Sequence, residues 1–345
     1  MTGDKQKAAD AARPILRSAK IVPPQEGLAD GGLRIEDGDE IPAVIDKLVR
    51  GLRHVAGAIP GGNDLADAAA LEITAIGPQI RVQGETVLAF TGADLSQKVN
   101  GKGVDLWRGI RVRAGDIISF GPLRNGCRAY LCVAGGVDVP PVFGSRSTGT
   151  LNKIGGYKGR RLEKGDVIKT FKPEFPLDEI EGRSLPKEYV PNFLTEATIR
   201  ILPGGYEYRL TEESLTEFFK ATWTVAVNSN RVAYYLNGPK LSFKPEEQPF
   251  GAGSNPSNVV DIAYPIGSVQ VPGGEHPVML MNDGVTGGGF AIVGTVVRAD
   301  LDIAAQLKPG DHLVFKGIGI TEALEIRKEK ADKILAIKEA TRYPF

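Results

Sequence analysis

The stretch "EITAIGPQIRVQGETVLAFTGAD", residues 72–94, decides the fold class. It contains three short runs of β-branched and other apolar residues, and Gly-Pro and Gln-Gly separate these runs. Short runs of this composition between turn residues are typical of neighbouring β-strands. The stretch therefore predicts three consecutive strands.

The same pattern continues beyond Asp94. "GIRVRAGDIISFG" begins at Gly109 and "CRAYLCVAGG" begins at Cys127, and each combines apolar runs with turn residues. Many short strands at such spacing predict a mainly β protein of the barrel or sandwich type. A weak internal repeat, for example "TGADLSQKVNG" against "NSNRVAYYLNG", favours two related barrels, and chance similarity between β-turns is the alternative.

Helical patterns occur mainly near the ends of the chain. "IPAVIDKLVRGL" (41–52) and "ALEIRKEKADKILAIKEA" (323–340) place apolar residues at helical spacing, and "TEESLTEFFK" predicts a short helix capped by Thr211. The proline-rich connection at 172–192 predicts a domain boundary. The predicted organisation is a divergent, partly helical N-terminal segment (1–66), a first β-barrel domain (67–190), a second β-barrel domain (191–320) and a C-terminal helix (321–345).

Composition excludes several classes of protein. Lys and Arg together number 42 and Asp and Glu number 42, so the formal net charge is zero and neither nucleic acid nor a membrane is an expected partner. Cys127 and Cys132 lack a zinc-ligand spacing and the three histidines are scattered, so no metal is expected. The sequence shows no long apolar run and no signal-peptide core, so the chain is expected to be soluble and cytoplasmic.

The stretch "VQVPGGEHPVMLMNDGVTGGGF", residues 269–290, carries the candidate site. It reads as strand, turn and strand, and polar residues and three glycines follow the apolar run. Asn282, Asp283 and Thr286 bring hydrogen-bonding groups, and the glycines permit close approach of a backbone. The stretch predicts a small-molecule site, although Asp-Gly is also a standard hairpin signal and Asp283 could serve only the turn.

Several segments together resemble a known family. They are "LEITAIGP", "TGAD", "GCRAYLCVAGGVDVPPVFGSRST", "NRVAYYLNGPKL", "GSVQVPGGEHPVMLMNDGVTGGGF" and "VVRADLDIAAQLKPGDHLVF", which run in order from Leu71 to Phe315. They are similar to the allophanate hydrolase subunit 2 family, which includes the Kip-type antagonist subunit, the C subunit of 5-oxoprolinase and the second half of the urea carboxylase carboxyltransferase domain. The resemblance implies two cyclophilin-like β-barrels with a few peripheral helices, working beside a first-subunit partner.

The departures from the family pattern also carry information. The family's usual opening motif is absent, and the family's Asp-x-Gln-Thr-x-Gly-Gly-Tyr is replaced here by "DGVTGGGF", which begins at Asp283. A second arginine of the family is also missing after Arg231. These changes imply an altered substrate or a divergent member.

The resemblance and the residue chemistry together give a set of site residues. Asp283, as base or orienting group, and Asn282 are the candidate catalytic residues. Arg231 and Arg146 suit a carboxylate, although Arg146 could instead tie its own loop. The candidate substrate-binding residues are Gln270, Thr286, Arg231, Arg146, Gly287, Gly288 and Gly289. No Lys-Ser/Thr pair follows the glycines, so a phosphate loop is not expected.

Three functions remain open at this point. The first is a subunit of a biotin-dependent carboxyltransferase that acts on urea or a related small amide or carbon acid, with carboxybiotin on a partner carrier. The second is the C subunit of a 5-oxoprolinase, in which a partner protein binds ATP. The third is a non-catalytic antagonist of a kinase inhibitor, which needs only an apolar interface.

Overall fold

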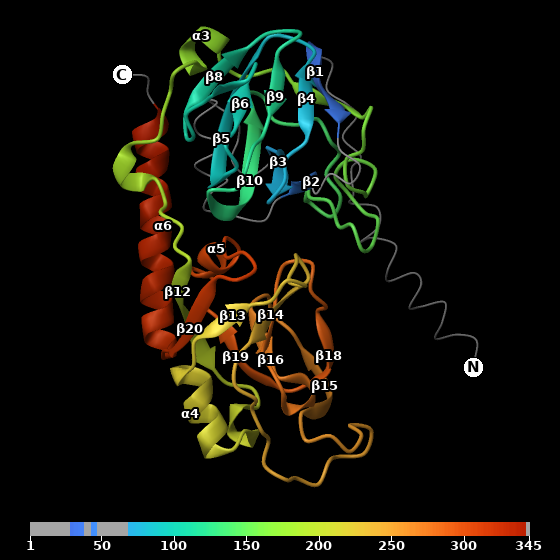
Figure 1. The fold of residues 1–345 in the computed structure, drawn as a ribbon, viewed down its shortest axis with the longest axis vertical. Coiled ribbons are helices and arrows are strands. Elements are labelled where there is room, and N and C mark those ends of the chain that lie inside the picture. Colours follow the sequence, from blue (N-terminus) through green and yellow to red (C-terminus); the bar gives the residue numbers. More distant parts are fainter. Residues whose placement is uncertain (1–27, 38–42, 47–67, 343–345) are drawn as a thin grey trace, which may run out of the picture.

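The structure, a computed structural model, describes residues 28–37, 43–46 and 68–342. Two β-rich bodies follow each other along the long axis, and the helix α6 (Ile320–Arg342) runs beside them (Figure 1). Strands dominate both bodies, and the other helices are short. The prediction of a mainly β protein with a few peripheral helices is confirmed.

The first body consists of two antiparallel sheets that enclose one hydrophobic core. The six-stranded sheet has the order β11-β1-β4-β9-β6-β7, and the five-stranded sheet has the order β2-β3-β10-β5-β8. Leu33, Leu71 and Phe90 are among the side chains buried between them. The strands are β1 (Leu28–Asp37), β2 (Ala43–Asp46), β3 (Ala70–Thr74), β4 (Gln79–Val82), β5 (Thr86–Asp94), β6 (Lys98–Val99), β7 (Lys102–Gly103), β8 (Gly109–Val112), β9 (Ile117–Ser119), β10 (Asn125–Val133) and β11 (Val167–Phe171). The three strands expected in 72–94 are β3, β4 and β5.

The second body is a closed barrel with a separate ribbon. The barrel order is β12-β19-β16-β17-β14-β13-β20, and β15 and β18 form a two-stranded sheet. Phe218 and Phe315 stack with ring centroids 4.7 Å apart in its core. The strands are β12 (Glu196–Pro203), β13 (Trp223–Val225), β14 (Ala233–Asn237), β15 (Asn258–Ala263), β16 (Ser268–Gln270), β17 (Val278–Leu280), β18 (Gly287–Phe290), β19 (Ile292–Val296) and β20 (His312–Gly317).

The helix predicted over 41–52 is wrong where the structure describes it. Residues Ala43–Asp46 form β2, which pairs antiparallel with β3, and the remainder of that prediction lies outside the described residues. Val44 and Ile45 are β-branched, a residue type that favours strands over helices, and both pair with residues of β3. Pairing with β3 therefore overrides the helical spacing.

The other two predicted helices are confirmed. α6 contains the stretch 323–340, and α4 (Glu212–Lys220) begins after Thr211, whose hydroxyl oxygen accepts a hydrogen bond from the Ser214 amide at 3.2 Å. The connection 172–192 carries only a short helix, α3 (Leu177–Ile180), and one 3-10 turn, η1 (Lys187–Tyr189). The remaining short helical elements are η2 (Glu207–Arg209), η3 (Pro272–Gly274) and α5 (Leu301–Ala304).

Three Gly-Asp turns close strand connections in both bodies. Their aspartate oxygens accept hydrogen bonds from the amide three residues earlier: Asp116 from Arg113 at 2.7 Å, Asp166 from Glu163 at 2.8 Å and Asp311 from Lys308 at 3.0 Å. The preceding glycines have φ of 90–93°, a conformation that glycine adopts without strain. These aspartates therefore serve the turns.

Asp166 gives a testable pH dependence. Burial alone would raise its pKa, but hydrogen bonds from Arg160 at 2.7 and 2.9 Å and from the Glu163 amide outweigh burial and lower the pKa. A lowered folded-state pKa means that the stabilisation is present above the unfolded value of ~3.9 and is lost as the pH falls through the folded value. We expect Asp166→Asn to reduce the free energy of unfolding by about 1–3 kcal/mol at pH 7, measured by urea denaturation.

The wild-type and variant curves should converge as the pH falls below the unfolded value of ~3.9 and through the lower folded-state value. The matched control is Asp105→Asn, because the Asp105 side chain is exposed and its nearest arginine nitrogen, in Arg108, lies 3.8 Å away. This variant should leave stability unchanged. A deficit in Asp166→Asn that stays constant from pH 7 to pH 3 would contradict the proposed linkage.

Candidate functional site

The candidate stretch folds as strand, turn, strand and then a tight turn at Asp283. The Gly284 amide bonds the Met281 carbonyl at 3.0 Å, and the Asp283 amide bonds the Arg231 carbonyl at 3.0 Å. Asp283 therefore does occupy a turn, which fixes its backbone. Its side chain has a separate partner.

The carboxylate of Asp283 forms a two-point ion pair with Arg231. Arg231 Nε donates to Asp283 Oδ2 at 2.9 Å, and Nη2 donates to Oδ1 at 3.2 Å. The two side chains are 15% and 14% exposed, so the pair is largely shielded yet reaches the surface. A carboxylate has about four acceptor positions and this pair uses two, which leaves capacity for a ligand N–H group.

Arg231 also joins the two bodies. Its Nη1 donates to Oε1 of Glu72, a fully buried residue of β3, at 2.5 Å. The hydroxyl of Tyr130 on β10 donates to Glu72 Oε2 at 3.0 Å, and Arg128 Nε lies 3.6 Å from Oε1. The site is thus a chain of charged groups, Asp283–Arg231–Glu72–Arg128, that crosses from the barrel into the five-stranded sheet.

Glu72 and Arg128 are not among the site residues predicted from the sequence. A signal is nevertheless present, because each charge stands inside an apolar run, "LEIT" and "CRAYLCV", that predicts a buried strand. A buried charge needs a partner, so a charged residue in such a run marks a polar contact within the protein.

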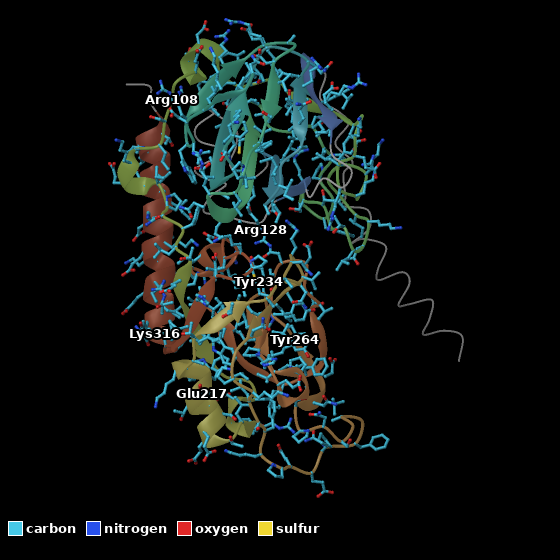
Figure 2. The ribbon with its side chains drawn as sticks, viewed as in Figure 1. Arg108, Arg128, Glu217, Tyr234, Tyr264 and Lys316 are labelled. Atoms are coloured by element: carbon cyan, nitrogen blue, oxygen red, sulfur yellow. The ribbon has the colours of Figure 1, made fainter. Side chains whose placement is uncertain are left out.

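A buried hydrogen-bond network continues the contact between the bodies. Arg128 Nη1 donates to the Tyr234 hydroxyl at 2.6 Å and to the Ala305 carbonyl, and the Tyr234 hydroxyl donates to the Leu307 carbonyl at 2.8 Å. Gln306 Oε1 accepts from the amides of Cys127 and Arg128, both at 2.9 Å. Figure 2 shows Arg128 and Tyr234 where the bodies meet.

Burial raises the pKa of Tyr234 to about 12, so its hydroxyl stays protonated near neutral pH.

Gln270 lies on β16 and is almost fully buried, at 4% exposure. Its Nε2 atom has no hydrogen-bond partner among the described residues. In the barrel register Gln270 lies beside Val278 of β17 and Ile292 of β19. A buried amide with an unused donor is compatible with a role in binding, which stays a prediction.

The three glycines lie on β18 in the two-stranded sheet, and Thr286 directly precedes this strand. Thr286 is exposed and its carbonyl accepts from the Tyr264 amide at 2.9 Å, while Gly287 and Gly288 pair with β15. A Cβ atom on Gly288 would lie 3.0 Å from the Tyr264 ring, and the Tyr264 hydroxyl binds both the amide and the carbonyl of Phe290. Close packing on Tyr264 is thus one reason for glycine at this position.

Arg146 lies in the first body, in the loop after β10. Its Nη1 donates to the Val139 carbonyl, and its guanidinium carbon lies 5.0 Å from the centroid of the Phe171 ring. These contacts tie the loop to its own body, the alternative role considered for Arg146. Asn282, half-buried, precedes Asp283 in the turn. The structure brings Arg231 and Asp283 together; a single cleft shared with the other candidates stays a prediction.

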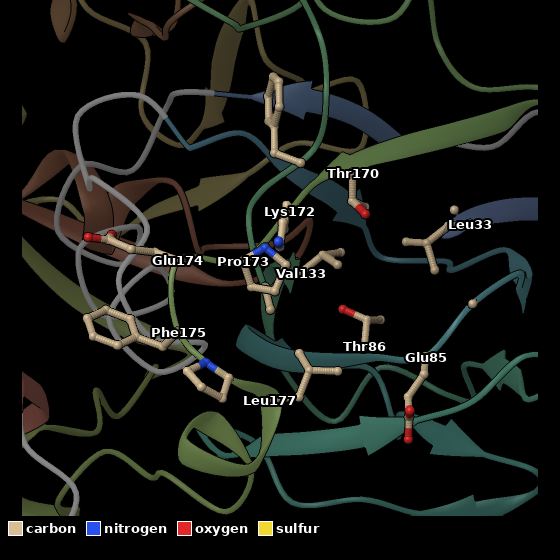
Figure 3. A pocket seen from close by; sticks show the side chains of 15 residues that line it. Leu33, Glu85, Thr86, Val133, Thr170, Lys172, Pro173, Glu174, Phe175 and Leu177 are labelled. Carbon is tan, nitrogen blue, oxygen red and sulfur yellow. The ribbon is translucent and has the colours of Figure 1, made fainter. Parts of the chain in front are cut away.

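Three cavities lie away from the chain of charged groups that begins at Asp283. One of about 460 Å³ lies at the end of the first body, where Thr86, Val133 and Pro173 surround it (Figure 3). One of about 600 Å³ lies beside α6, and one of about 540 Å³ lies near Trp107. Asp283 lines none of these three.

Two absences concern the described residues alone. In residues 28–37, 43–46 and 68–342 no group of three or more His, Cys, Asp and Glu side chains is arranged to hold a metal ion. Over the same residues, no helix has both the length and the hydropathy needed to cross a bilayer.

The chain is similar to proteins of two kinds. Urea amidolyase of Lachancea kluyveri is 36% identical over 281 residues, which cover 79% of this chain and 15% of that protein. The C subunit of 5-oxoprolinase from Escherichia coli is 34% identical over 273 residues, which cover 78% of this chain and 81% of that protein. The crystal structure of the K. lactis urea amidolyase matches all of this chain and 22% of that one, with a TM-score of 0.80 and 29% identity.

A family model described as "Carboxyltransferase domain, subdomain A and B" matches residues 59–317. The chain spans less than a quarter of the length of either urea amidolyase, at 15% and 22%. The family match covers well over half of the sequence. The chain therefore belongs to the carboxyltransferase-domain family, subdomains A and B.

Proposed function

We propose that this protein supplies half of a composite site for biotin-dependent carboxyl transfer to urea or a related small amide in the cytoplasm. The observation that carries the proposal is the Asp283 carboxylate, held at two points by Arg231 yet still partly exposed at the junction of the bodies. Family membership supports the same class of chemistry. A first-subunit homologue is the partner that would cover this surface.

The residues of the site suit an amide substrate. An amide nitrogen becomes a nucleophile when a base removes its proton, and the unused acceptor positions of Asp283 suit that N–H group. Asn282 and the amide of Gln270, whose nitrogen has no partner among the described residues, match the donor and acceptor pattern of urea or of a ureido ring. Carboxybiotin on a partner carrier would supply the carboxyl group. ATP, where it is used, would be bound by another protein of the complex.

A second candidate is the ATP-dependent opening of a cyclic amide, as part of a 5-oxoprolinase. The supporting observation is the extent of the similarity, which covers 81% of the C subunit of the Escherichia coli 5-oxoprolinase and 15% of a urea amidolyase. Lactam opening also needs an acceptor or base beside an amide N–H group, so Asp283 fits both reactions.

Reconstitution distinguishes these functions. Co-expression with a first-subunit homologue should give one complex in size-exclusion chromatography at micromolar concentration. The complex is then assayed with urea, bicarbonate, ATP and a biotinylated carboxylase partner, and separately with 5-oxoproline, ATP and the remaining oxoprolinase subunits. Separate elution of the two proteins would remove the composite-site proposal. A stable complex without turnover in either assay would favour the antagonist function.

A further inference from the structure

Glu72 belongs to the first body, yet its position bears on Asp283 in the second. It lies on β3 in the five-stranded sheet, is fully buried, and pairs in register with Tyr130 of β10. The Tyr130 hydroxyl holds Oε2 at 3.0 Å, while Oε1 faces Arg231 Nη1 at 2.5 Å and Arg128 Nε at 3.6 Å. Its carboxylate is therefore a fixed point between two bodies.

The geometry of arginine transmits this fixed position to Asp283. A guanidinium group is planar, so anchoring Nη1 fixes the plane and direction of Nε and Nη2. Those two nitrogens hold both oxygens of Asp283 at 2.9 and 3.2 Å. Without such an anchor, a carboxylate that is 14% exposed could rotate about its side-chain torsions together with its arginine partner.

We infer that Glu72 is a positioning residue: it orients Arg231 from the first body and, through Arg231, the Asp283 carboxylate that acts in the site. The inference rests on the proposed function, since it assigns to Asp283 the role of base or acceptor. Misplacement of a reacting group by about 1 Å costs up to a hundredfold in rate, so a distant anchor matters for turnover. Glu72 acts through Arg231 and is not a catalytic residue.

Two variants of Glu72 distinguish the effect of its side-chain length from the effect of its negative charge. Glu72→Asp keeps the negative charge in the interior but shortens the side chain by about 1.5 Å, so it withdraws from Arg231. Glu72→Gln keeps the length but removes the charge that makes the bond to Arg231 strong. In the reconstituted complex we expect both to lower kcat by about tenfold with KM changed by less than about threefold, because orientation rather than binding is lost.

The matched control is Asp300→Asn. Asp300 is 1% exposed and forms a two-point pair with Arg200 within the second body, so its loss perturbs a comparable buried ion pair away from Arg231. kcat per folded complex should stay at the wild-type value in this variant. Folded fractions are measured by near-UV circular dichroism before each assay.

The double variants decide between positioning and general stabilisation. In an Asp283→Asn background, Glu72→Asp should cause no further loss of kcat, because the group that it positions is already disabled. Wild-type kcat in both Glu72 variants, or a full tenfold additional loss in the Asp283→Asn background, would overturn the inference. If Asp283→Asn itself were fully active, the proposed function of the site would fail first, so the two failures are distinguishable.

Discussion

Replacement of Asp283 by Asn is expected to reduce turnover of the reconstituted complex by about a hundredfold or more, the scale for losing a general base. Asn fills the same volume and suits a tight turn, so the backbone bond between the Asp283 amide and the Arg231 carbonyl should persist. Asn lacks the charge for a two-point pair with Arg231 and cannot accept a proton at neutral pH. The measurement is kcat per folded complex, with melting temperature recorded in parallel.

The matched control for this variant is Asp116→Asn. Asp116 also lies in a tight turn with a neighbouring glycine, and its carboxylate accepts from the Arg113 amide and from Asn100 Nδ2, all within the first body. This variant should retain full turnover and partner binding. Wild-type turnover in Asp283→Asn together with an unchanged melting temperature would show that Asp283 only shapes the hairpin.

The strands are predictable from local sequence because their signal is local. Apolar β-branched runs between turn residues mark β3, β4 and β5, and each strand lies where its run lies. β2 is not predictable in this way, because Val44 and Ile45 fit a helical face equally well and only the pairing partner β3 decides. A local sequence pattern cannot show which distant strand a segment will pair with.

The site is partly predictable for a similar reason. From residue type alone, Asp283 and Arg231 are each predicted to contact the substrate. The structure shows that they instead form an ion pair with each other, although 52 positions separate them in the sequence. Glu72 lies 159 positions from Arg231, and no spacing rule connects residues in different β bodies. Residue types indicate that a polar contact is needed, and the tertiary fold alone decides which charges meet.

Arg128 is a buried charge at the contact between the two bodies. Its side chain is 3% exposed and meets Glu72, the Tyr234 hydroxyl and the Ala305 carbonyl. When one member of a buried charged network is removed, the remaining groups stay buried without either their partner or water to bond them. This lowers the free energy of unfolding by about 3–5 kcal/mol. The exposed ion pair between Lys240 and Glu275 has water available on both sides.

We therefore expect Arg128→Met to lower the free energy of unfolding by about 3–5 kcal/mol in urea denaturation, a large share of the ~5–15 kcal/mol typical of a folded protein. Lys240→Met should leave the unfolding curve unchanged. A local readout exists at Cys127, since burial raises the pKa of its thiol and its amide is bound by Gln306 across the junction. Alkylation of Cys127 should accelerate in Arg128→Met while Cys132, buried in a cluster with Trp107 and with Ile337 of α6, stays protected. Equal stability of the Arg128 and Lys240 variants would mean that apolar packing, rather than this network, holds the two bodies together.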